Sequence, residues 1–280
     1  MKNCPQCGTA LPQEARFCFT CGASQQPTIG AGGPGGIHWS AELLPQFLDR
    51  FWSRLDERVK AEQNARELAA YKERVYESGF RETVHRRLEQ FQSQCRQEES
   101  LEEEPVQQRL FQQLQCLLDD LLDFFFVMYA QELNVVPLPE QILGYQGKSR
   151  DEIDLRKMGL AFLDFAAENE RVHTDLVQAP VKVLRNAAKT FLTPEKDELI
   201  WFICDLSLLG NGKEGFAMTD QALYWKSGWQ PAQKVFYHKL TSLQREKEWI
   251  LINDIYFNAT PRLNTKMIWL LRKLARLNRV

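Results

Sequence analysis

Four of the seven cysteines fall within the first 21 residues and form two CxxC pairs. Ten residues separate the pair Cys4 and Cys7 from the pair Cys18 and Cys21, and a glycine directly follows each pair. Two thiolate pairs at this spacing can close around one tetrahedral zinc ion when the segment between them folds back. About twenty residues bury too little apolar surface to fold alone, so metal binding must supply the folding free energy. The pattern therefore predicts a structural zinc site with these four cysteines as ligands.

A single CxxC pair is also the motif of thiol–disulfide exchange, which is the alternative interpretation. That chemistry uses one pair at the start of a helix, so two copies followed by glycine favour the metal. Four thiolates fill a tetrahedral site, which argues against a catalytic zinc. Residues 1–23 resemble the short zinc ribbon at the N-terminus of many bacterial proteins. This resemblance implies a structural or recognition module.

Residues 24–38 are rich in glycine and proline and have no apolar periodicity, so they predict a flexible tether. The chain has 280 residues, enough for two or three domains, and a formal net charge of −2 that indicates no general affinity for nucleic acid. No apolar leader follows Met1, and the apolar run 124–130 is too short to span a bilayer. We therefore expect a cytoplasmic protein.

Between residues 39 and 193, apolar residues recur at the three- and four-residue spacing of amphipathic helices. Residues 106–133 are apolar around most of a helical circumference, which predicts the central helix. Further helices are expected near 150–170 and 180–192, so the region predicts a helical bundle. The long helix expected from Glu42 onward packs either within the chain or across a homo-oligomer, and the pattern leaves both open.

Residues 119–123 read DDLLD, which matches the DDxxD motif by which isoprenoid synthases hold Mg²⁺ and a diphosphate. Helix positions i, i+1 and i+4 can place two carboxylates on one face. Those enzymes use a second acidic motif opposite the first, and the nearest candidate, residues 253–260, lacks the closing acid. The favoured interpretation is therefore an exposed acidic stripe on a helix.

From about residue 197 the apolar pattern alternates with a period of two, which predicts strands. Asn253 and Asp254 separate two apolar stretches and predict a hairpin turn. Thr260 and Pro261 predict the start of a final amphipathic helix. The expected strands lie in the stretches 198–209, 215–220, 222–226, 235–240, 248–252 and 255–259.

Five to seven short antiparallel strands followed by one helix, together with the segment GKEGFAMTDQALYWK, resemble the pleckstrin-homology-like (PH-like) domains of bacteria. The resemblance covers residues 195–280. It implies an antiparallel β-barrel capped by a helix, serving as an assembly or partner-binding module. The expected fold is thus a multidomain α+β protein with a zinc ribbon (1–23), a linker (24–38), a helical bundle (39–193) and a PH-like domain.

The final helix carries six basic residues and no acidic one. Its basic face is solvated, docks on an acidic surface of this chain or of a partner, or contacts nucleic acid or anionic lipid, and the sequence leaves all three open. A lone basic helix without base-stacking aromatic residues is weak evidence for nucleic acid. The candidate partner-binding residues are Lys266, Arg272, Lys273, Arg276 and Arg279.

Catalysis finds little support, because the four histidines lie in different segments and no nucleophile elbow, P-loop or dinucleotide motif is present. We expect a protein that is not an enzyme. The leading hypothesis is a zinc-binding cytosolic interaction or scaffold protein that docks other proteins through the ribbon and the PH-like domain. The alternative is a nucleic-acid-associated regulator that binds through the ribbon and the basic final helix.

Overall fold

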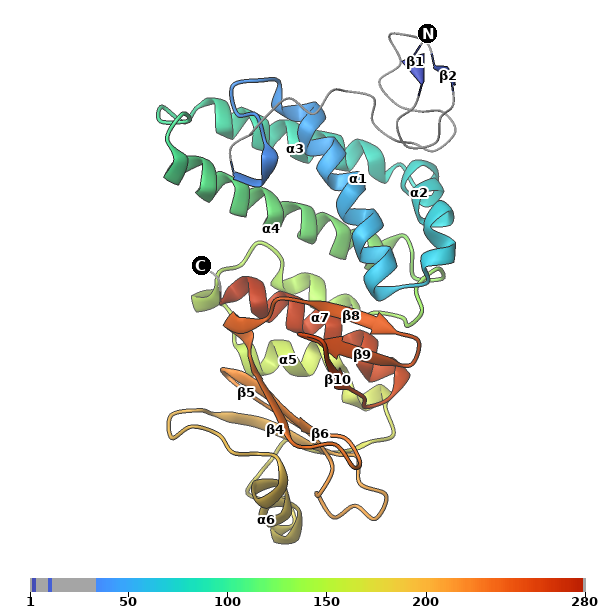
Figure 1. The fold of residues 1–280 in the computed structure, drawn as a ribbon, viewed down its shortest axis with the longest axis vertical. Helices are drawn as coiled ribbons and strands as arrows, with labels where there is room; N and C mark the ends of the chain where they lie inside the picture. The colour runs from blue at the N-terminus through green and yellow to red at the C-terminus, as the bar shows by residue number, and fades with distance from the viewer. Residues whose placement is uncertain (1, 4–9, 12–33, 279–280) are drawn as a thin grey trace.

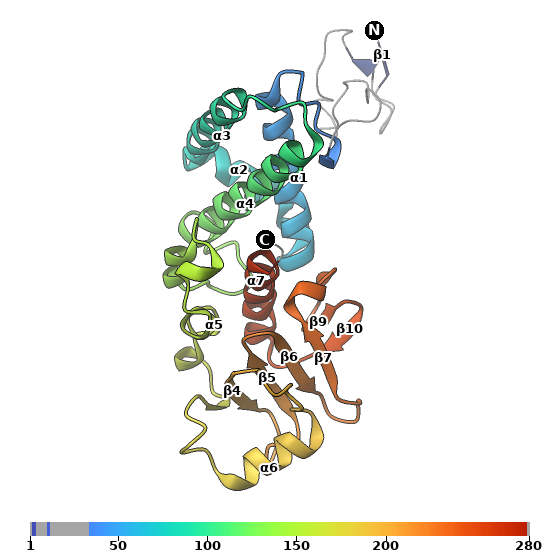
Figure 2. The ribbon, with the colours of Figure 1, turned by 90° about the vertical axis from the view of Figure 1, so that its left-hand side faces the viewer.

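A computed structural model describes residues 2–3, 10–11 and 34–278 of the chain. A helical bundle lies at one end of the described structure and antiparallel sheets lie at the other, with the last helix between them (Figures 1 and 2). The helices are α1 (Leu43–Glu62), α2 (Leu68–Glu77), α3 (Phe80–Arg96), α4 (Glu104–Met128), α5 (Leu155–Leu163), α6 (Val181–Thr190) and α7 (Pro261–Leu277). The strands are β1 (Lys2–Asn3), β2 (Ala10–Leu11), β3 (Arg171–His173), β4 (Ile200–Asp205), β5 (Gly215–Thr219), β6 (Ala222–Lys226), β7 (Gln233–Phe236), β8 (Leu243–Glu246), β9 (Trp249–Ile252) and β10 (Ile255–Phe257).

Helices α1 to α4 form the bundle, and the apolar stripe of α1 is buried in it. The single long helix expected from Glu42 is instead two helices, because the chain leaves the helical conformation at Gln63. The Asn64 side chain then caps a short 3-10 turn by accepting a hydrogen bond from the backbone N–H of Arg66 at 3.2 Å. The Gln63 side chain accepts a hydrogen bond from the N–H of Val135 at 3.0 Å, which fixes the break against the segment that follows α4.

The strands after α6 form antiparallel sheets, as their alternating pattern predicted. One sheet has the order β3-β4-β5-β6-β7 and the other β10-β9-β8. Asn253 and Asp254 both have positive φ, 49° and 64°, and form the predicted turn between β9 and β10. In the described residues the two sheets do not close into a barrel. The short strands β3 and β8 were not predicted, and the stretch expected as a strand at 235–240 turns into a 3-10 helix at Tyr237.

The five-stranded sheet is covered on both faces. Ile203, Ala217 and Tyr224 point to one face, where they pack with α6, whereas Phe216 and Trp225 point to the other, where α5 and α7 lie. This alternation follows from the two-residue period of a strand. The helices predicted near 150–170 and 180–192 are therefore present as α5 and α6, but they pack on the sheets rather than completing the bundle.

Helix α7 begins where the sequence predicted. The Thr260 hydroxyl accepts a hydrogen bond from the N–H of Leu263 at 3.3 Å, and Pro261 occupies the first turn. Most of the helix is buried, because it contacts α5, β8 and β9 on the sheet side and approaches α1 and α4 on the bundle side. Helix α7 therefore joins the two halves of the molecule, together with β8, which contacts α1.

Candidate functional site: a charged junction between α1, α4 and α7

The four predicted zinc ligands, Cys4, Cys7, Cys18 and Cys21, lie outside the described residues. The described part of the N-terminus is the pair of short strands β1 and β2, which run antiparallel with Lys2 opposite Leu11. Within residues 34–278, no group of three or more His, Cys, Asp or Glu side chains is placed to hold a metal ion. The cysteine pairs thus remain the predicted metal ligands of the chain.

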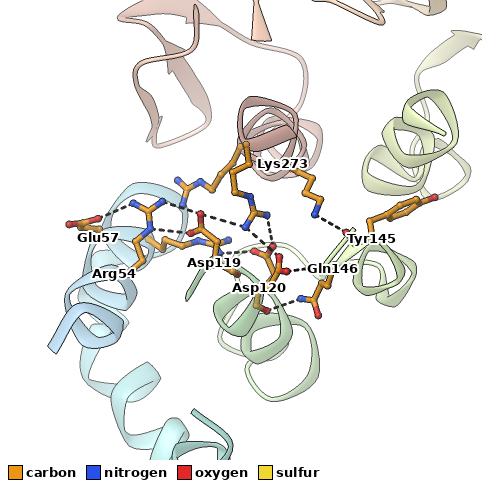
Figure 3. A network of polar contacts seen from close by, with 12 residues as sticks. Arg54, Glu57, Asp119, Asp120, Tyr145, Gln146 and Lys273 are labelled. Carbon is orange, nitrogen blue, oxygen red and sulfur yellow. Dashed lines mark hydrogen bonds and ion pairs between the residues drawn. The ribbon is translucent and has the colours of Figure 1, made fainter. Parts of the chain in front are cut away.

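The basic side chains of α7 are directed into the molecule. The Lys266 ammonium group donates to the carbonyl oxygen of Leu163 at 3.1 Å and lies 2.6 Å from a carboxylate oxygen of Glu168, so it holds the end of α5. The Lys273 ammonium group donates to the carbonyl oxygen of Tyr145 at 2.7 Å (Figure 3). Lys266 and Lys273 are 1% and 6% exposed, so neither forms part of a solvated basic face.

Arg272 and Arg276 of α7 meet acids of the helical bundle. The Arg276 guanidinium lies 3.5 Å from a carboxylate oxygen of Asp119, 3.5 Å from one of Asp120 and 3.1 Å from one of Asp123. Arg272 forms an ion pair with Glu62 of α1. The bundle of this chain therefore supplies the acidic surface on which the basic helix docks. Arg279, the fifth candidate partner-binding residue, lies outside the described residues.

The DDLLD motif is buried at this junction, so its interpretation as an exposed acidic stripe is wrong. Asp119 and Asp123 are 2% and 7% exposed. Arg54 reaches both carboxylate oxygens of Asp119, at 3.0 and 3.3 Å, as Figure 3 shows. The Arg58 guanidinium donates to Asp123 at 2.6 Å. The carboxylates of the motif thus form ion pairs with arginines from α1 and α7, whereas in the diphosphate-binding enzymes such carboxylates hold Mg²⁺.

Arg58 is the centre of the cluster and is 1% exposed. It donates to both carboxylate oxygens of Glu62, at 3.0 and 3.1 Å, in the two-pronged geometry that suits guanidinium and carboxylate. Its guanidinium also lies 4.4 Å from the centre of the Trp269 ring on α7, a cation–π contact. One side chain therefore joins α1 to α4 by charge and to α7 by stacking.

The electrostatics of the cluster follow from burial opposed by charge. Burial alone would raise the pKa of Asp119, but Arg276, Arg54 and Arg58 outweigh it and hold that pKa well below its usual range. The acids around Arg58 and Arg276 likewise overcome burial and raise the pKa of both arginines. Arg272 behaves differently: burial lowers its pKa, and Glu62 does not offset the effect.

A cavity of about 710 Å³ opens beside the cluster. Its walls come from α1, α4, α7 and the segment 240–244 that precedes and begins β8. Five basic residues and two acidic ones line it, together with amide and hydroxyl side chains. The basic residues are Arg54, Arg58, Lys60, Arg272 and Arg276. This arrangement can hold an anion, whereas it offers a cation few free carboxylates.

The α1 residues of this cluster were not predicted as a site from the sequence, although their spacing indicates that they are buried. Phe51, Leu55, Arg58 and Glu62 recur at four-, three- and four-residue spacing, so the two charged residues continue the buried apolar stripe. A charged pair four residues apart on a buried helical face implies an internal ion pair. The same reasoning applies to Asp119 and Asp123, which lie within the apolar helix α4.

Comparison with known proteins identifies one part of the chain. Residues 3–25 match the zinc-ribbon domain family. The chain therefore contains a zinc ribbon. Domains of this family typically bind zinc, and the matched segment includes both CxxC pairs. No curated protein and no solved structure matches the chain. In the part of the chain that the structure describes, no helix is long and apolar enough to cross a membrane.

Proposed function

We propose that this chain is a zinc-binding cytosolic interaction protein, in which the zinc ribbon and the sheet region dock to other proteins. The ribbon recognises one partner, with Cys4, Cys7, Cys18 and Cys21 holding a structural zinc ion. The predicted tether allows the ribbon to move relative to the rest of the protein. Linking two modest contacts on one chain raises the effective concentration of the second, so overall affinity increases without a large interface. The match to the zinc-ribbon family supports this role.

The sheet region is proposed to be a PH-like docking module. Strands β4 to β7 form one antiparallel run, β8 to β10 form a second, and α7 follows, which is the element order that led to the resemblance. The sheet region differs from a PH-like fold in two respects. The sheets do not close into a barrel within the described residues, and β3 and α6 are added to the larger sheet. The proposal therefore concerns partner binding rather than a lipid headgroup.

Exposed apolar side chains at one end of the larger sheet carry the proposal. Leu208 and Leu209, in the loop between β4 and β5, are 94% and 81% exposed, and Trp229, between β6 and β7, is fully exposed. The pairing of Gly215 with Lys226 places both loops at the same end of the sheet. Large apolar residues gathered at one exposed place mark a contact surface more often than isolated ones do.

The loop that carries the two leucines is anchored rather than loose. The Asp205 carboxylate accepts hydrogen bonds from the N–H of Ser207 at 2.9 Å and of Gly212 at 3.0 Å. The Asn186 side chain on α6 donates to the carbonyl oxygen of Asn211 at 2.6 Å. Because the backbone is held on both sides, the leucines are presented to solvent at low conformational cost to a partner.

Nucleic-acid association is the weaker candidate. The basic residues of α7 on which it relied are engaged inside the molecule, apart from Arg262, which is about half exposed. Phosphate binding requires cations that can reach the duplex or strand. Apart from Arg262 and Arg279, the latter outside the described residues, the contact would fall to the zinc ribbon, which has only Lys2 and Arg16 as basic residues.

A comparison of captured partners tests the proposal. The full-length protein, a 38–280 truncation and a Leu208→Ser, Trp229→Ser double variant are recovered from native cells after nuclease treatment, and their partners are quantified by mass spectrometry. Leu199→Ser is the matched control, because Leu199 is 70% exposed but lies at the opposite end of the same sheet. We expect one protein partner to be lost on truncation and one to be lost from the double variant but kept by the control.

Two results would argue against the proposal. If nucleic acid is the material that co-purifies and it disappears with nuclease or salt, the alternative function gains. If the double variant and the Leu199→Ser control retain the same partners, the apolar loops are not a docking surface. Light scattering on the purified protein additionally reports whether it is a homo-oligomer, as the sequence allowed.

A further inference from the structure

The charged junction holds more positive than negative charge on its cavity side. Glu62 already accepts from Arg58 through both of its carboxylate oxygens, and it is also the ion-pair partner of Arg272. Asp119 is likewise shared, between Arg54 and Arg276. The other acids of the junction, Asp120 and Asp123, pair with Arg276 and Arg58 but do not line the cavity. The cavity wall itself therefore has a deficit of acids, with five basic residues against two acidic ones.

Two further observations locate this deficit. The Nε atom of Arg276 is buried and has no hydrogen-bond acceptor among the described residues. The pKa of Arg272 is lowered because burial destabilises its charged form by more than the attraction of Glu62 stabilises it. Both side chains line the cavity. A buried donor without an acceptor, and a buried charge that is poorly compensated, both destabilise the protein unless a ligand or water completes them.

The cavity has the size and wall chemistry of a small-molecule site. Its volume of about 710 Å³ exceeds what a bare phosphate fills, and falls in the range of roughly 300–1,000 Å³ typical of ligand pockets. Gln108, Gln112 and Ser242 provide polar groups, and Phe111 provides an aromatic surface. Amide and hydroxyl groups around a cationic end are suited to an organic anion with a polar body.

We propose that this cavity binds a phosphate-bearing small molecule, with its phosphate against Arg272 and with Arg54 and Arg276 alongside. A phosphate presents three oxygens, so several guanidinium groups can share it, whereas a carboxylate presents two. The organic part of the ligand extends along the wall that Gln108, Gln112 and Phe111 provide. The site is separate from the zinc ribbon and from the apolar loops, and it does not depend on the interaction role proposed above.

The test measures binding of inorganic phosphate and of adenosine monophosphate to the full-length protein by titration calorimetry, at an ionic strength held constant with sodium chloride. We expect both to bind, the nucleotide more tightly because it fills more of the cavity. The informative variant is Gln112→Glu, which adds a negative charge to the cavity wall. The matched control is Gln113→Glu, because its neighbour Gln113 is also exposed on α4 but does not line the cavity.

Gln112→Glu should weaken binding by roughly tenfold, about 1.4 kcal/mol, through repulsion across a partly screened distance, whereas Gln113→Glu should leave it unchanged. Both substitutions are exposed and conserve helix propensity, so both variants should fold. Any phosphate that binds the metal of the ribbon would do so equally in the two variants. Absence of binding by both probes, or equal weakening in the two variants, overturns the proposal.

Discussion

Helices α6 and α7 both pack against the sheets, but their outer surroundings differ. Helix α6 contacts the sheet through apolar side chains, among them Val183, Ala187 and Phe191, and nothing in the described residues covers its far side (Figure 1). Helix α7 also buries an apolar face on the sheets, yet its other side meets the bundle through Arg272 and Arg276. Helix α6 is thus attached by apolar burial and the neutral hydrogen bond of Asn186, with no ion pair among the described residues, whereas α7 is attached by burial and charge.

The difference between apolar and charged contacts explains how the two halves of the molecule are held in a defined position. Apolar contacts are not directional, so they tolerate small shifts of one surface over another. A buried arginine tolerates no such shift, because moving it away from its acids leaves every partner unsatisfied. The charged junction should therefore fix how the bundle meets α7, at the cost of sensitivity to single substitutions and to pH. Four substitutions test this contrast.

The largest effect is expected for Arg58→Met. This substitution removes the charge but keeps most of the length, and it leaves Glu62 and Asp123 without their shared cation in a buried place. The free energy of unfolding should fall by about 3–5 kcal/mol, the usual cost of breaking a buried ion pair from one side. Chemical denaturation followed by circular dichroism measures it.

A double variant separates lost pairing from lost packing. Adding Asp123→Asn to Arg58→Met neutralises an acid that has lost this cation, while Arg276 keeps Asp119 and Asp120, so part of the lost stability should return. If the double variant is as unstable as, or less stable than, Arg58→Met, stacking on Trp269 rather than charge explains the effect. A cost below about 1 kcal/mol for the single variant would contradict the central place given to Arg58.

On the apolar side of the comparison, Phe191→Ala should cost about 3 kcal/mol, because it opens a cavity between the end of α6 and the sheet. Lys189→Ala, an exposed change on the same helix, is the control and should cost little. The loss from Phe191→Ala should be the same at pH 4 and pH 7, because no charge is involved. A loss that varies with pH would mean that a charged group contributes to holding α6.

The loss of stability caused by Asp119→Asn, in contrast, should depend on pH. The pKa of Asp119 is lowered in the folded protein, so its carboxylate stabilises the fold above its unfolded pKa of about 4 and progressively less as the pH falls below that value. The variant should be about 2 kcal/mol less stable than the parent at pH 7, and the gap should narrow between about pH 4 and pH 2. Asp197→Asn, at an exposed position, should show no such gap. A gap that stays constant down to pH 2 would exclude a lowered pKa.

The sequence predicted those parts of the fold that depend on local chemistry. Thr260 and Pro261 mark the start of α7, and Asn253 with Asp254 marks the hairpin, because caps and turns are set by a few neighbouring residues. The four cysteines predicted the ribbon that the family match supports. Strand β3 could not be predicted, since its three residues carry no periodicity and form a strand because β4 lies beside them.

The charged junction was not predicted for a related reason. Counting apolar residues along α1 and α4 defines the buried face, but it assigns Arg58, Asp119 and Asp123 to solvent by default. Which charged residues are buried depends on three helices that lie far apart in the sequence and meet only in the fold. The basic face of α7 was accordingly open to three interpretations, and docking on an acidic surface of the same chain is the one that the structure shows for Arg272 and Arg276.

The smallest effect is expected for Arg262→Gln, at the start of the same basic helix. Arg262 is about half exposed and lies 3.5 Å from Glu168, which retains the closer partner Lys266 at 2.6 Å. The substitution should cost less than about 1 kcal/mol, and added salt should reduce the cost further, because water and ions already screen the pair. Thermal unfolding at low and high salt checks both points. Since Arg262 and Arg58 each pair with a buried acid, a large cost for Arg262→Gln would mean that burial of the arginine is not what gives the junction its strength.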